Sequence, residues 1–460
     1  MGILALADFG STYTKVTLVD RAERRVVGRA QAPTSIRTDV MRGYRDALAA
    51  AAEAAGGAPA PELELAASSA GGGLRVAAVG LVEDLTAAAA RQTALNAGAR
   101  VSAVLSGSLG EGELEALRAA APEIVLFAGG TDGGQRALVL DNARRLAEAA
   151  LPALVVVACN AEIAEQAAAI LAGAGGGVEL APNVMPRLGQ LEIEGARAAI
   201  SRAFLEHVIG GKRLSADAAF AAMVRMPTPE AVLAATGLLA HGSGGHPGAG
   251  DVVVVDVGGA TTDVHSSRSE RATPGIEQPL LPPPLTRRTV EGDLGLRAGA
   301  EGVLDADRGW LLDQLPSTRG EELEEAVRDR ARRPEWVPGE GPEARLDGLI
   351  AVSCATQALA RHCGTMLLTT SPKGPPTLRA DGPDLREAKR VIGTGGVFAH
   401  RGDGATILPR ALARRAPRSL APVDAAPAVD SGYVLAAAGL LAAVEPDLAL
   451  AVLDRELAEN

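Results

Sequence analysis

Two segments of the chain, 248 positions apart, repeat one arrangement of residues that suits the binding of phosphate. The segments are ADFGSTYTKVTLV, which begins at Ala7, and VDVGGATTDVHS, which begins at Val255. In each, an apolar run ends in an aspartate, Asp8 or Asp256, and a glycine follows two positions later, before hydroxyl residues and a second strand-like stretch. Glycine lets the backbone approach a ligand closely, and clustered N–H groups and hydroxyls can donate to phosphate oxygens.

The two turns predict separate roles for glycine, hydroxyl and carboxylate. A carboxylate cannot bind phosphate directly, but hydrated Mg²⁺ can bridge it to the phosphates, so Asp8 and Asp256 are the predicted metal residues. The residues predicted to bind phosphate are Gly10, Ser11, Thr12, Gly258, Gly259, Thr261 and Thr262. The sequence contains no P-loop, in which a glycine-rich turn ends in Gly-Lys-Ser/Thr and opens a helix.

A third glycine-rich stretch, VIGTGGVF from Val391, has the pattern of a short strand followed by a turn. A flat adenine could pack against that turn, and the residues predicted to bind it are Gly393, Gly395 and Gly396. Two facing hairpins would hold a nucleotide polyphosphate from both sides, and this third element would hold the base and ribose. One Asp-x-Gly turn is common in ordinary hairpins. The prediction of a nucleotide site therefore depends on all three elements and their order.

The order of the three elements resembles the actin-like ATPase superfamily, which includes actin, Hsp70 chaperones, and sugar and acetate kinases. DVGGATTD, from Asp256, matches the D-x-G-G-x-T-x-D form of the second phosphate loop. The resemblance implies two actin-like, ribonuclease H-like α/β domains with a nucleotide cleft between them. It also implies that Asp8 and Asp256 hold Mg²⁺ through water, that Thr12 and Thr261 contact phosphates, and that Asp263 orients a metal-bound or attacking water.

Five longer strings resemble the GlmL/MutL family, whose members accompany adenosylcobalamin-dependent glutamate mutase and related aminomutases. They are ADFGSTYTK, VLFAGGTDGG, VDVGGATTDVHS, RTVEGDLGLR from Arg288 and VIGTGGVFAH. The resemblance covers residues 3 to about 445. It implies an ATP- and Mg²⁺-dependent, chaperone-like reactivating factor that helps a mutase expel damaged cobalamin. The partner would be glutamate mutase or an ornithine- or lysine-type aminomutase.

Two other functions are compatible with the same loops. One is a small-molecule kinase, or a hydantoinase/oxoprolinase-like enzyme that couples ATP to substrate chemistry. That reading requires a substrate base and a specificity pocket, and the sequence assigns neither. The other is a filament-forming relative of actin.

The composition of the chain indicates which classes of partner and which cellular compartment to expect. The chain of 460 residues has a net charge of −11 and only ten aromatic residues, which disfavours nucleic acid as a partner. Cys159, Cys354 and Cys363 are too few and scattered for a disulfide framework or a zinc site. The N-terminus lacks the pattern of a signal peptide, and no apolar run is long enough to span a membrane. We therefore expect a cytoplasmic protein without a membrane partner.

The periodicity of apolar residues predicts an α/β architecture. Strands are expected at Ile3–Ala7 and Asp251–Asp256, a helix at Met41–Ala55, and strand–loop–helix units with parallel strands between residues 63 and 175. The stretch HGSGGHPGAG from His241 predicts a boundary between a first domain at 1–245 and a second at 251–460. Subdivisions within 60–240 are left open.

Two further patterns of the second half complete this coarse prediction. Residues 270–285 are expected to form an exposed connection without regular strand pairing, because they are rich in proline. The last third is expected to hold helices around a single strand, Arg390–Ile392.

Three features remain open between functional and structural roles. The loop 128–134, AGGTDGG, is either an anion site at a helix N-terminus or a tight turn capped by Asp132. The segment 288–297 either lines the nucleotide or partner site or is a solvated loop. For Lys15, a solvent-facing strand position is favoured over a phosphate contact. The histidines are expected to be structural because they lack the spacing of a metal site or triad.

Overall fold

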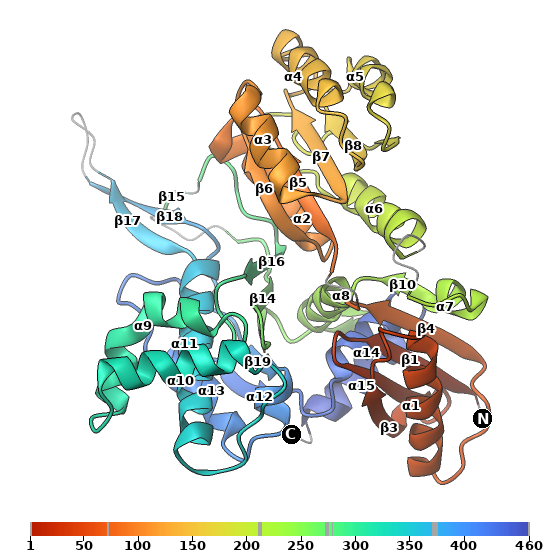
Figure 1. Cartoon of the computed structure of the whole chain (residues 1–460), viewed down its shortest axis with the longest axis vertical. Coiled ribbons are helices and arrows are strands. Elements are labelled where there is room, and N and C mark those ends of the chain that lie inside the picture. The colour runs from red at the N-terminus through yellow and green to blue at the C-terminus, as the bar shows by residue number, and fades with distance from the viewer. Residues whose placement is uncertain are drawn as a thin grey trace. The chain divides into compact units, whose positions relative to one another are not determined.

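The chain forms two compact units. The computed structural model describes residues 2–70, 73–209, 214–271, 276–277, 279–369 and 376–458 (Figure 1). Unit 1 comprises Met1–Ala234, Leu280–Pro284 and Ala436–Leu448. Unit 2 comprises Ala235–Pro279, Leu285–Leu435 and Ala449–Asn460.

The first sheet of unit 1 has five strands in the order β10-β4-β1-β2-β3. The strands are β1 (Ile3–Phe9), β2 (Tyr13–Asp20), β3 (Arg25–Pro33), β4 (Leu63–Ser68) and β10 (Val224–Met226). β1 is antiparallel to β2, and β2 to β3, whereas β1, β4 and β10 run parallel. The carboxyl ends of β1, β4 and β10 therefore meet at one edge, the usual position of ligands in open sheets that contain parallel strands.

The second sheet of unit 1 is entirely parallel, with the order β6-β5-β7-β8-β9. Its strands are β5 (Arg75–Val79), β6 (Arg100–Leu105), β7 (Ile124–Gly129), β8 (Leu154–Cys159) and β9 (Val178–Leu180). The connections between them contain the helices α2 (Ala88–Asn96), α3 (Glu111–Ala120), α4 (Ala137–Glu148) and α5 (Ala164–Leu171). This confirms the predicted alternation of strand and helix. β4, within the same stretch of sequence, instead joins the first sheet.

Unit 2 repeats the first sheet of unit 1, with the order β16-β14-β13-β19-β20. Its strands are β13 (Val252–Val257), β14 (Thr262–Ser267), β16 (Thr286–Glu291), β19 (Arg390–Thr394) and β20 (Ala426–Val429). β13, β14 and β16 pair antiparallel, and β13, β19 and β20 run parallel, as their counterparts do in unit 1. The same strand order with the same directions in both units confirms the predicted α/β, actin-like fold class.

The last third of the chain contains more strand than the sequence predicted. Besides β19 it holds β20 and the pair β17 (Thr365–Thr369) and β18 (Thr377–Asp381), so the expectation of a single strand is wrong. β18 also pairs with β15 (Ile276–Glu277), which lies in the connection expected to lack pairing. The predicted boundary stretch contains a short hairpin, β11 (Gly242–Ser243) and β12 (His246–Pro247).

The remaining helices surround these sheets. They are α1 (Val40–Ala54), α6 (Glu194–Ala203), α7 (Ala218–Met223), α8 (Thr228–His241), α9 (Ala300–Gln314), α10 (Gly320–Arg332), α11 (Gly341–His362), α12 (Gly396–Ala399), α13 (Ile407–Leu412), α14 (Val434–Ala442) and α15 (Pro446–Ala458). α1 shows why the sequence predicts them: Asp39 caps its N-terminus by accepting from the Met41 N–H, and Tyr44, Ala47 and Ala51 form a buried stripe. In the described part of the chain, every helix is too short or too polar to cross a membrane.

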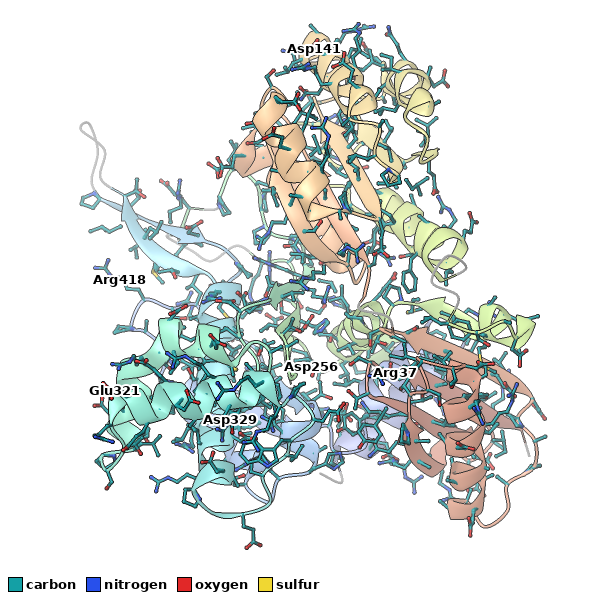
Figure 2. The ribbon with its side chains drawn as sticks, viewed as in Figure 1. Arg37, Asp141, Asp256, Glu321, Asp329 and Arg418 are labelled. Carbon is teal, nitrogen blue, oxygen red and sulfur yellow. The ribbon has the colours of Figure 1, made fainter. Side chains whose placement is uncertain are left out.

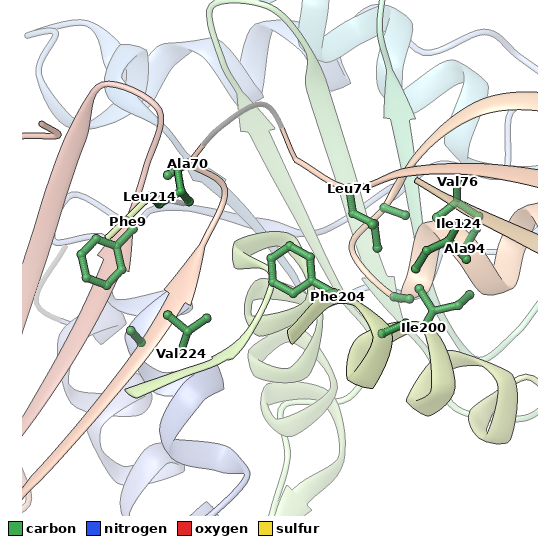
Figure 3. Close-up of a cluster of buried hydrophobic side chains, with 14 of the residues drawn as sticks. Phe9, Ala70, Leu74, Val76, Ala94, Ile124, Ile200, Phe204, Leu214 and Val224 are labelled. Atoms are coloured by element: carbon green, nitrogen blue, oxygen red, sulfur yellow. The ribbon is translucent and has the colours of Figure 1, made fainter. Parts of the chain in front are cut away.

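The core of unit 1 joins its two sheets. One buried cluster extends from Phe9 on β1 to Ile124 on β7, and Figure 3 shows part of it, including Leu74, Phe204 and Val224. Unit 2 has its own core, in which Val253, Val255 and Val257 of β13 pack with apolar residues of α11 and α13. The hairpins that carry the predicted phosphate residues therefore begin on strands that are buried except at Asp8 and Asp256. Such strands fix the position of the turns that follow them.

Candidate functional site

The first predicted phosphate turn is a tight hairpin between β1 and β2. The Gly10 N–H donates to the Tyr13 carbonyl at 3.1 Å. Ser11 and Thr12 at its tip are exposed, so their hydroxyls and N–H groups are accessible to a ligand. A Cβ on Gly10 would lie 2.7 Å from the Tyr13 carbonyl oxygen, which explains why this position requires glycine. The Thr34 N–H, directly after β3, donates to the Thr12 carbonyl at the tip of the turn, at 2.8 Å.

Asp8 lies beside this turn and contacts two side chains, Thr228 and Lys15. Neither contact was predicted from the sequence. The Asp8 Oδ1 accepts from the Thr228 hydroxyl at 2.6 Å, and its Oδ2 lies 3.9 Å from the Lys15 Nζ. The side chain of Lys15 is 26% exposed and faces Asp8, so the favoured solvent-facing reading of Lys15 is wrong. Thr228 begins α8, directly after the strand β10. Only the parallel pairing of β10 with β4 brings it to the edge where β1 ends.

The second predicted turn, between β13 and β14, has the same backbone geometry. The Gly258 N–H donates to the Thr261 carbonyl at 2.9 Å, and Gly259 at the tip is exposed. Thr262 is placed differently from the other hydroxyl residues, because its buried side chain donates to the Leu294 carbonyl at 2.9 Å. A ligand would reach that hydroxyl only after this hydrogen bond breaks.

Asp263 is held by an arginine that the sequence left unassigned. Arg288 of β16 donates through Nε to the Asp263 Oδ1 at 2.7 Å, and its Nη2 contacts the same oxygen. Thr261 also donates to this carboxylate, at 3.3 Å. The Arg288 side chain is 5% exposed and that of Asp263 13%, so the pair is largely shielded from water. Asp263 directly faces Asp256 across the hairpin, and the Arg288 guanidinium offsets the repulsion of the two carboxylates.

The segment 288–297 supports the second turn, which contradicts its reading as a solvated loop. The Leu296 N–H donates to the Gly258 carbonyl at 3.0 Å, and the Arg297 N–H to the Gly259 carbonyl at 2.7 Å. The buried Arg297 guanidinium binds Asp347 of α11 at 2.8 Å, and Asp347 also binds the fully buried Arg330 at 2.7 Å. The second turn is therefore braced by a buried ion network.

The glycine-rich turn after β19 lies against the second hairpin. Thr394 at the end of β19 pairs with Asp256 in the parallel ladder. Gly395 has a φ of 102°, and a Cβ there would lie 2.8 Å from an Asp256 carboxylate oxygen. Gly393 is buried, and Gly396 is exposed. Figure 2 labels Asp256, which lies at the edge where β13 and β19 both end.

The structure thus brings together the predicted residues of the second hairpin and those of the glycine-rich turn. Asp8, Gly10, Ser11 and Thr12 belong to unit 1, and their use together with the residues of unit 2 stays a prediction. No pattern in the sequence indicates Thr228 as a neighbour of the first turn, whereas Arg288 and Arg297 bound the segment 288–297, for which a place at the nucleotide or partner site was one of the two predictions. Of the three, the two arginines lie in the string RTVEGDLGLR, on which the family resemblance partly depends.

The carboxylates of Asp8 and Asp256 fit an Mg²⁺ ion that is bound together with waters and phosphates better than an ion that is held by protein ligands alone. Among the described residues, no three His, Cys, Asp or Glu side chains gather closely enough to hold an ion. Mg²⁺ usually keeps several waters and takes one or two carboxylates together with substrate phosphates. Asp8 and Asp256 each stand beside a turn with accessible glycine and hydroxyl groups, which suits that mode of binding.

The loop 128–134 is a structural turn. The Asp132 carboxylate accepts from the Ala161 N–H at 2.9 Å and from the Asn183 side chain at 2.8 Å. The Gly133 N–H donates to the Asn160 side chain at 3.2 Å, and the Gly134 N–H to the Thr131 carbonyl at 2.9 Å. These groups are used within the fold, which favours a structural turn over an anion site. The prediction that Asp132 caps the following helix is wrong, because the N-cap residue of α4 is Arg136 and Asp132 accepts from Ala161 instead.

Burial shifts the pKa of several titratable groups inside unit 2. His362 contacts the Thr289 and Ser266 hydroxyls at 2.8 Å each, and burial holds its pKa well below 6.5. Burial likewise lowers the pKa of His265 and raises the pKa of Cys354 and of Cys363 to about 12. The expected structural roles of these histidines and cysteines agree with this burial.

Comparisons with known proteins place the chain in a family. The MutL protein family matches residues 4–457. A MutL protein of Clostridium tetanomorphum is 37% identical over 460 residues, which cover 99% of each chain. Two solved structures also align: a diol dehydratase-reactivating factor in its nucleotide-free form and a nucleotide-free acetone carboxylase. The first has 13% identity, covering 96% of this chain and 99% of that chain, with a TM-score of 0.34. The second has 12% identity, covering 96% and 70%, with a TM-score of 0.37. The chain therefore belongs to the MutL protein family.

Proposed function

We propose that this protein binds and hydrolyses ATP with Mg²⁺ and acts as a chaperone-like reactivating factor for an adenosylcobalamin-dependent mutase. The partner would be glutamate mutase or an ornithine- or lysine-type aminomutase. Membership of the MutL family supports the reactivating role. We also propose that the protein acts in the cytoplasm.

One observation carries the nucleotide part of the proposal. The same Asp-x-Gly hairpin occurs at the same strand junction of two sheets that have the same strand order and directions. Each turn is closed by the same hydrogen bond, from Gly10 to Tyr13 and from Gly258 to Thr261. A repeated fold that presents two polar turns of this kind suits one polyphosphate ligand with charge along its length.

The residues of the first hairpin would bind and orient the phosphates. The N–H groups and hydroxyls of the exposed residues Ser11 and Thr12 would donate to phosphate oxygens. Lys15, which reaches the face of Asp8, would add positive charge there. Thr228 fixes the Asp8 carboxylate through its hydroxyl and so keeps it oriented.

The residues of the second hairpin would complete the site. Gly259 and Thr261 would contact phosphates, and Asp263 would orient the attacking water. Arg288 keeps the Asp263 carboxylate in place through two donors on one guanidinium. Asp8 and Asp256 would hold Mg²⁺ through water, and the ion would neutralise charge on the phosphates during transfer to water. The chain's contribution is therefore positioning and electrostatic stabilisation.

Turnover of ATP by the purified protein tests the proposal. Hydrolysis is measured with Mg²⁺, alone and with a candidate mutase that carries inactivated cobalamin. Asp8→Ala and Asp256→Ala should each reduce hydrolysis by about 100-fold or more, because each removes a charged group that orients the reaction. Asp141→Ala is the matched control, since Asp141 lies on the surface of α4 and pairs only loosely with Arg144, 3.8 Å away (Figure 2).

The outcomes separate the parts of the proposal. Hydrolysis lost in both variants, kept in Asp141→Ala, and coupled to recovery of mutase activity would support it. ATP binding without any effect on a mutase would overturn the reactivating role and favour the small-molecule kinase. No ATP binding at all would overturn the nucleotide site.

A further inference from the structure

An exposed pair of aromatic rings lies beside the glycine-rich turn that follows β19. The Tyr433 hydroxyl and the His400 Nε2 are 3.0 Å apart, and the two ring centroids are 5.9 Å apart with a 48° angle between the planes. A Cβ on Gly396 would lie 3.9 Å from the Tyr433 hydroxyl and 4.0 Å from the His400 ring. The pair and the glycine turn therefore form one continuous surface within unit 2.

The backbone of Tyr433 has a conformation that an aromatic residue rarely takes. Its φ is 53°, in the left-handed region, where glycine is the residue with no steric cost. Tyr433 is the last residue of the connection between β20 and α14. A tyrosine at such a position points to a use for its side chain that the turn alone does not require.

The turn that presents Tyr433 is anchored by the buried Asp430. This carboxylate accepts from the Val434 N–H at 2.7 Å and the Leu435 N–H at 3.2 Å, which caps α14. It also accepts from the Thr394 hydroxyl at 3.1 Å. Asp430 thus ties the Tyr433 turn to the end of β19, one residue before Gly395.

Tyr433 is one of four among the ten aromatic side chains that the cores do not bury, and the other three are Tyr13, Trp310 and Trp336. Phe9, Tyr44 and Phe127, for example, are almost fully buried in the cores. Tyr433 is only partly buried, and its partner His400 is exposed. The pair therefore contributes a flat surface that the cores do not use.

We propose that Tyr433, oriented by His400, is the platform on which the nucleotide base stacks. The inference rests on the proposed nucleotide site and adds the residue that distinguishes a nucleotide from a bare polyphosphate. Stacking on a tyrosine ring tolerates any base, because every base has a π-face. The platform should therefore serve adenine and guanine alike, with Tyr433 as the contact residue and His400 as a positioning residue.

Binding of ATP, GTP and inorganic tripolyphosphate to the full chain, each with Mg²⁺, tests the proposal by titration calorimetry. Tyr433→Gly should weaken ATP and GTP by about tenfold or more and leave tripolyphosphate unchanged. Because glycine relieves the left-handed backbone, the melting temperature of this variant should be unchanged or higher. Tyr433→Phe keeps the ring and should keep most of the affinity. His400→Ala should weaken ATP by a smaller factor than Tyr433→Gly.

The outcomes distinguish this inference from the proposed function. If wild-type protein binds ATP and Tyr433→Gly binds it equally well, the base platform is wrong and the nucleotide site stands. A parallel loss of ATP and tripolyphosphate would also overturn the platform, because it would place the effect at the phosphates. If the wild-type protein binds neither ATP nor tripolyphosphate, the proposed function and the platform fail together.

Discussion

The two hairpins of this protein share a backbone but differ in the charges placed around it. In both, the first strand ends in an aspartate, and the glycine two positions later donates to the carbonyl three residues on. The residue facing Asp8 across the first hairpin is Lys15, whereas the residue facing Asp256 across the second is Asp263. The second hairpin recovers its positive charge from a third strand, through Arg288.

Their support differs as well. In the first hairpin, the Thr12 carbonyl accepts from the Thr34 N–H, and the Phe9 carbonyl accepts from the Ser69 and Ala70 N–H groups. The second accepts bonds from Leu296 and Arg297, and Arg297 continues into a buried network with Asp347. A repeated fold can therefore keep one turn geometry while the surrounding charges and bracing diverge. We infer that the second hairpin is the more rigid of the two.

The largest loss of stability is expected when the buried ion network behind the second hairpin is disrupted. Asp347→Asn leaves the buried Arg297 and Arg330 guanidinium groups without their shared carboxylate, which should lower the free energy of unfolding by about 3–5 kcal/mol. Urea denaturation measures this loss. Asp217→Asn is the control, because Asp217 pairs with a well exposed Arg45 and should cost less than about 1 kcal/mol. Equal effects of the two substitutions would contradict the role of the network as a brace.

The next largest effect on stability should distinguish the two cationic side chains beside the hairpins, Arg288 and Lys15. Arg288→Met should destabilise the protein by about 3 kcal/mol, because it leaves Asp263 shielded from water and facing Asp256. Lys15→Met should cost less than about 1 kcal/mol, since Lys15 is 26% exposed and lies 3.9 Å from Asp8. Denaturation of both variants checks the difference. A Lys15 variant as unstable as the Arg288 variant would show that the hairpins are equally dependent on their cations.

As the pH falls, unit 2 should lose stability at a higher pH than unit 1. Burial, with the nearby Arg288 and Arg287, holds the pKa of His265 and His362 below 6.5, so both are neutral when folded. The unfolded chain binds protons below pH 6.5, so the stability from the neutral forms is full above that pH and is lost as pH falls, by about 1.4 kcal/mol per histidine per pH unit.

Hydrogen exchange, expressed as opening free energies of β14 and β2 at pH 7.5 and 5.5, measures this difference. β2 is the internal control, because it belongs to unit 1 and neither His265 nor His362 does. An equal loss of protection in both strands would show that the two histidines are not its cause.

The sequence predicted these hairpins because their signals are local. An apolar run followed by Asp, Gly and hydroxyl residues specifies a strand and its turn within about ten positions. β13 illustrates this, since four consecutive valines are fully buried there. β20 was missed because it has four residues, one of them a proline, and is stabilised mainly by its neighbour β19.

The neighbours of the turns were missed because they come from distant parts of the chain. Thr228 reaches Asp8 across 220 positions, and Asp347 reaches Arg297 across 50. Lys15 shows a different failure. Alternation placed it on the correct face of β2, but not opposite a carboxylate, because what a face contacts depends on pairing that periodicity does not specify.

The smallest effect compares the matched glycines of the two turns. A Cβ at Gly10 would lie 2.7 Å from the Tyr13 carbonyl oxygen, whereas one at Gly258 would lie 3.1 Å from that of Thr261. Gly10→Ala must therefore displace backbone and should cost about 1–2 kcal/mol, whereas Gly258→Ala needs only a small adjustment and should cost less than about 1 kcal/mol. Thermal unfolding and ATP affinity of the two variants, measured together, check the order. The reverse order would mean that the second turn, tied to Leu296 and Arg297, cannot yield even by a few tenths of an ångström. In that case rigidity, rather than the available space, determines which glycine is needed more.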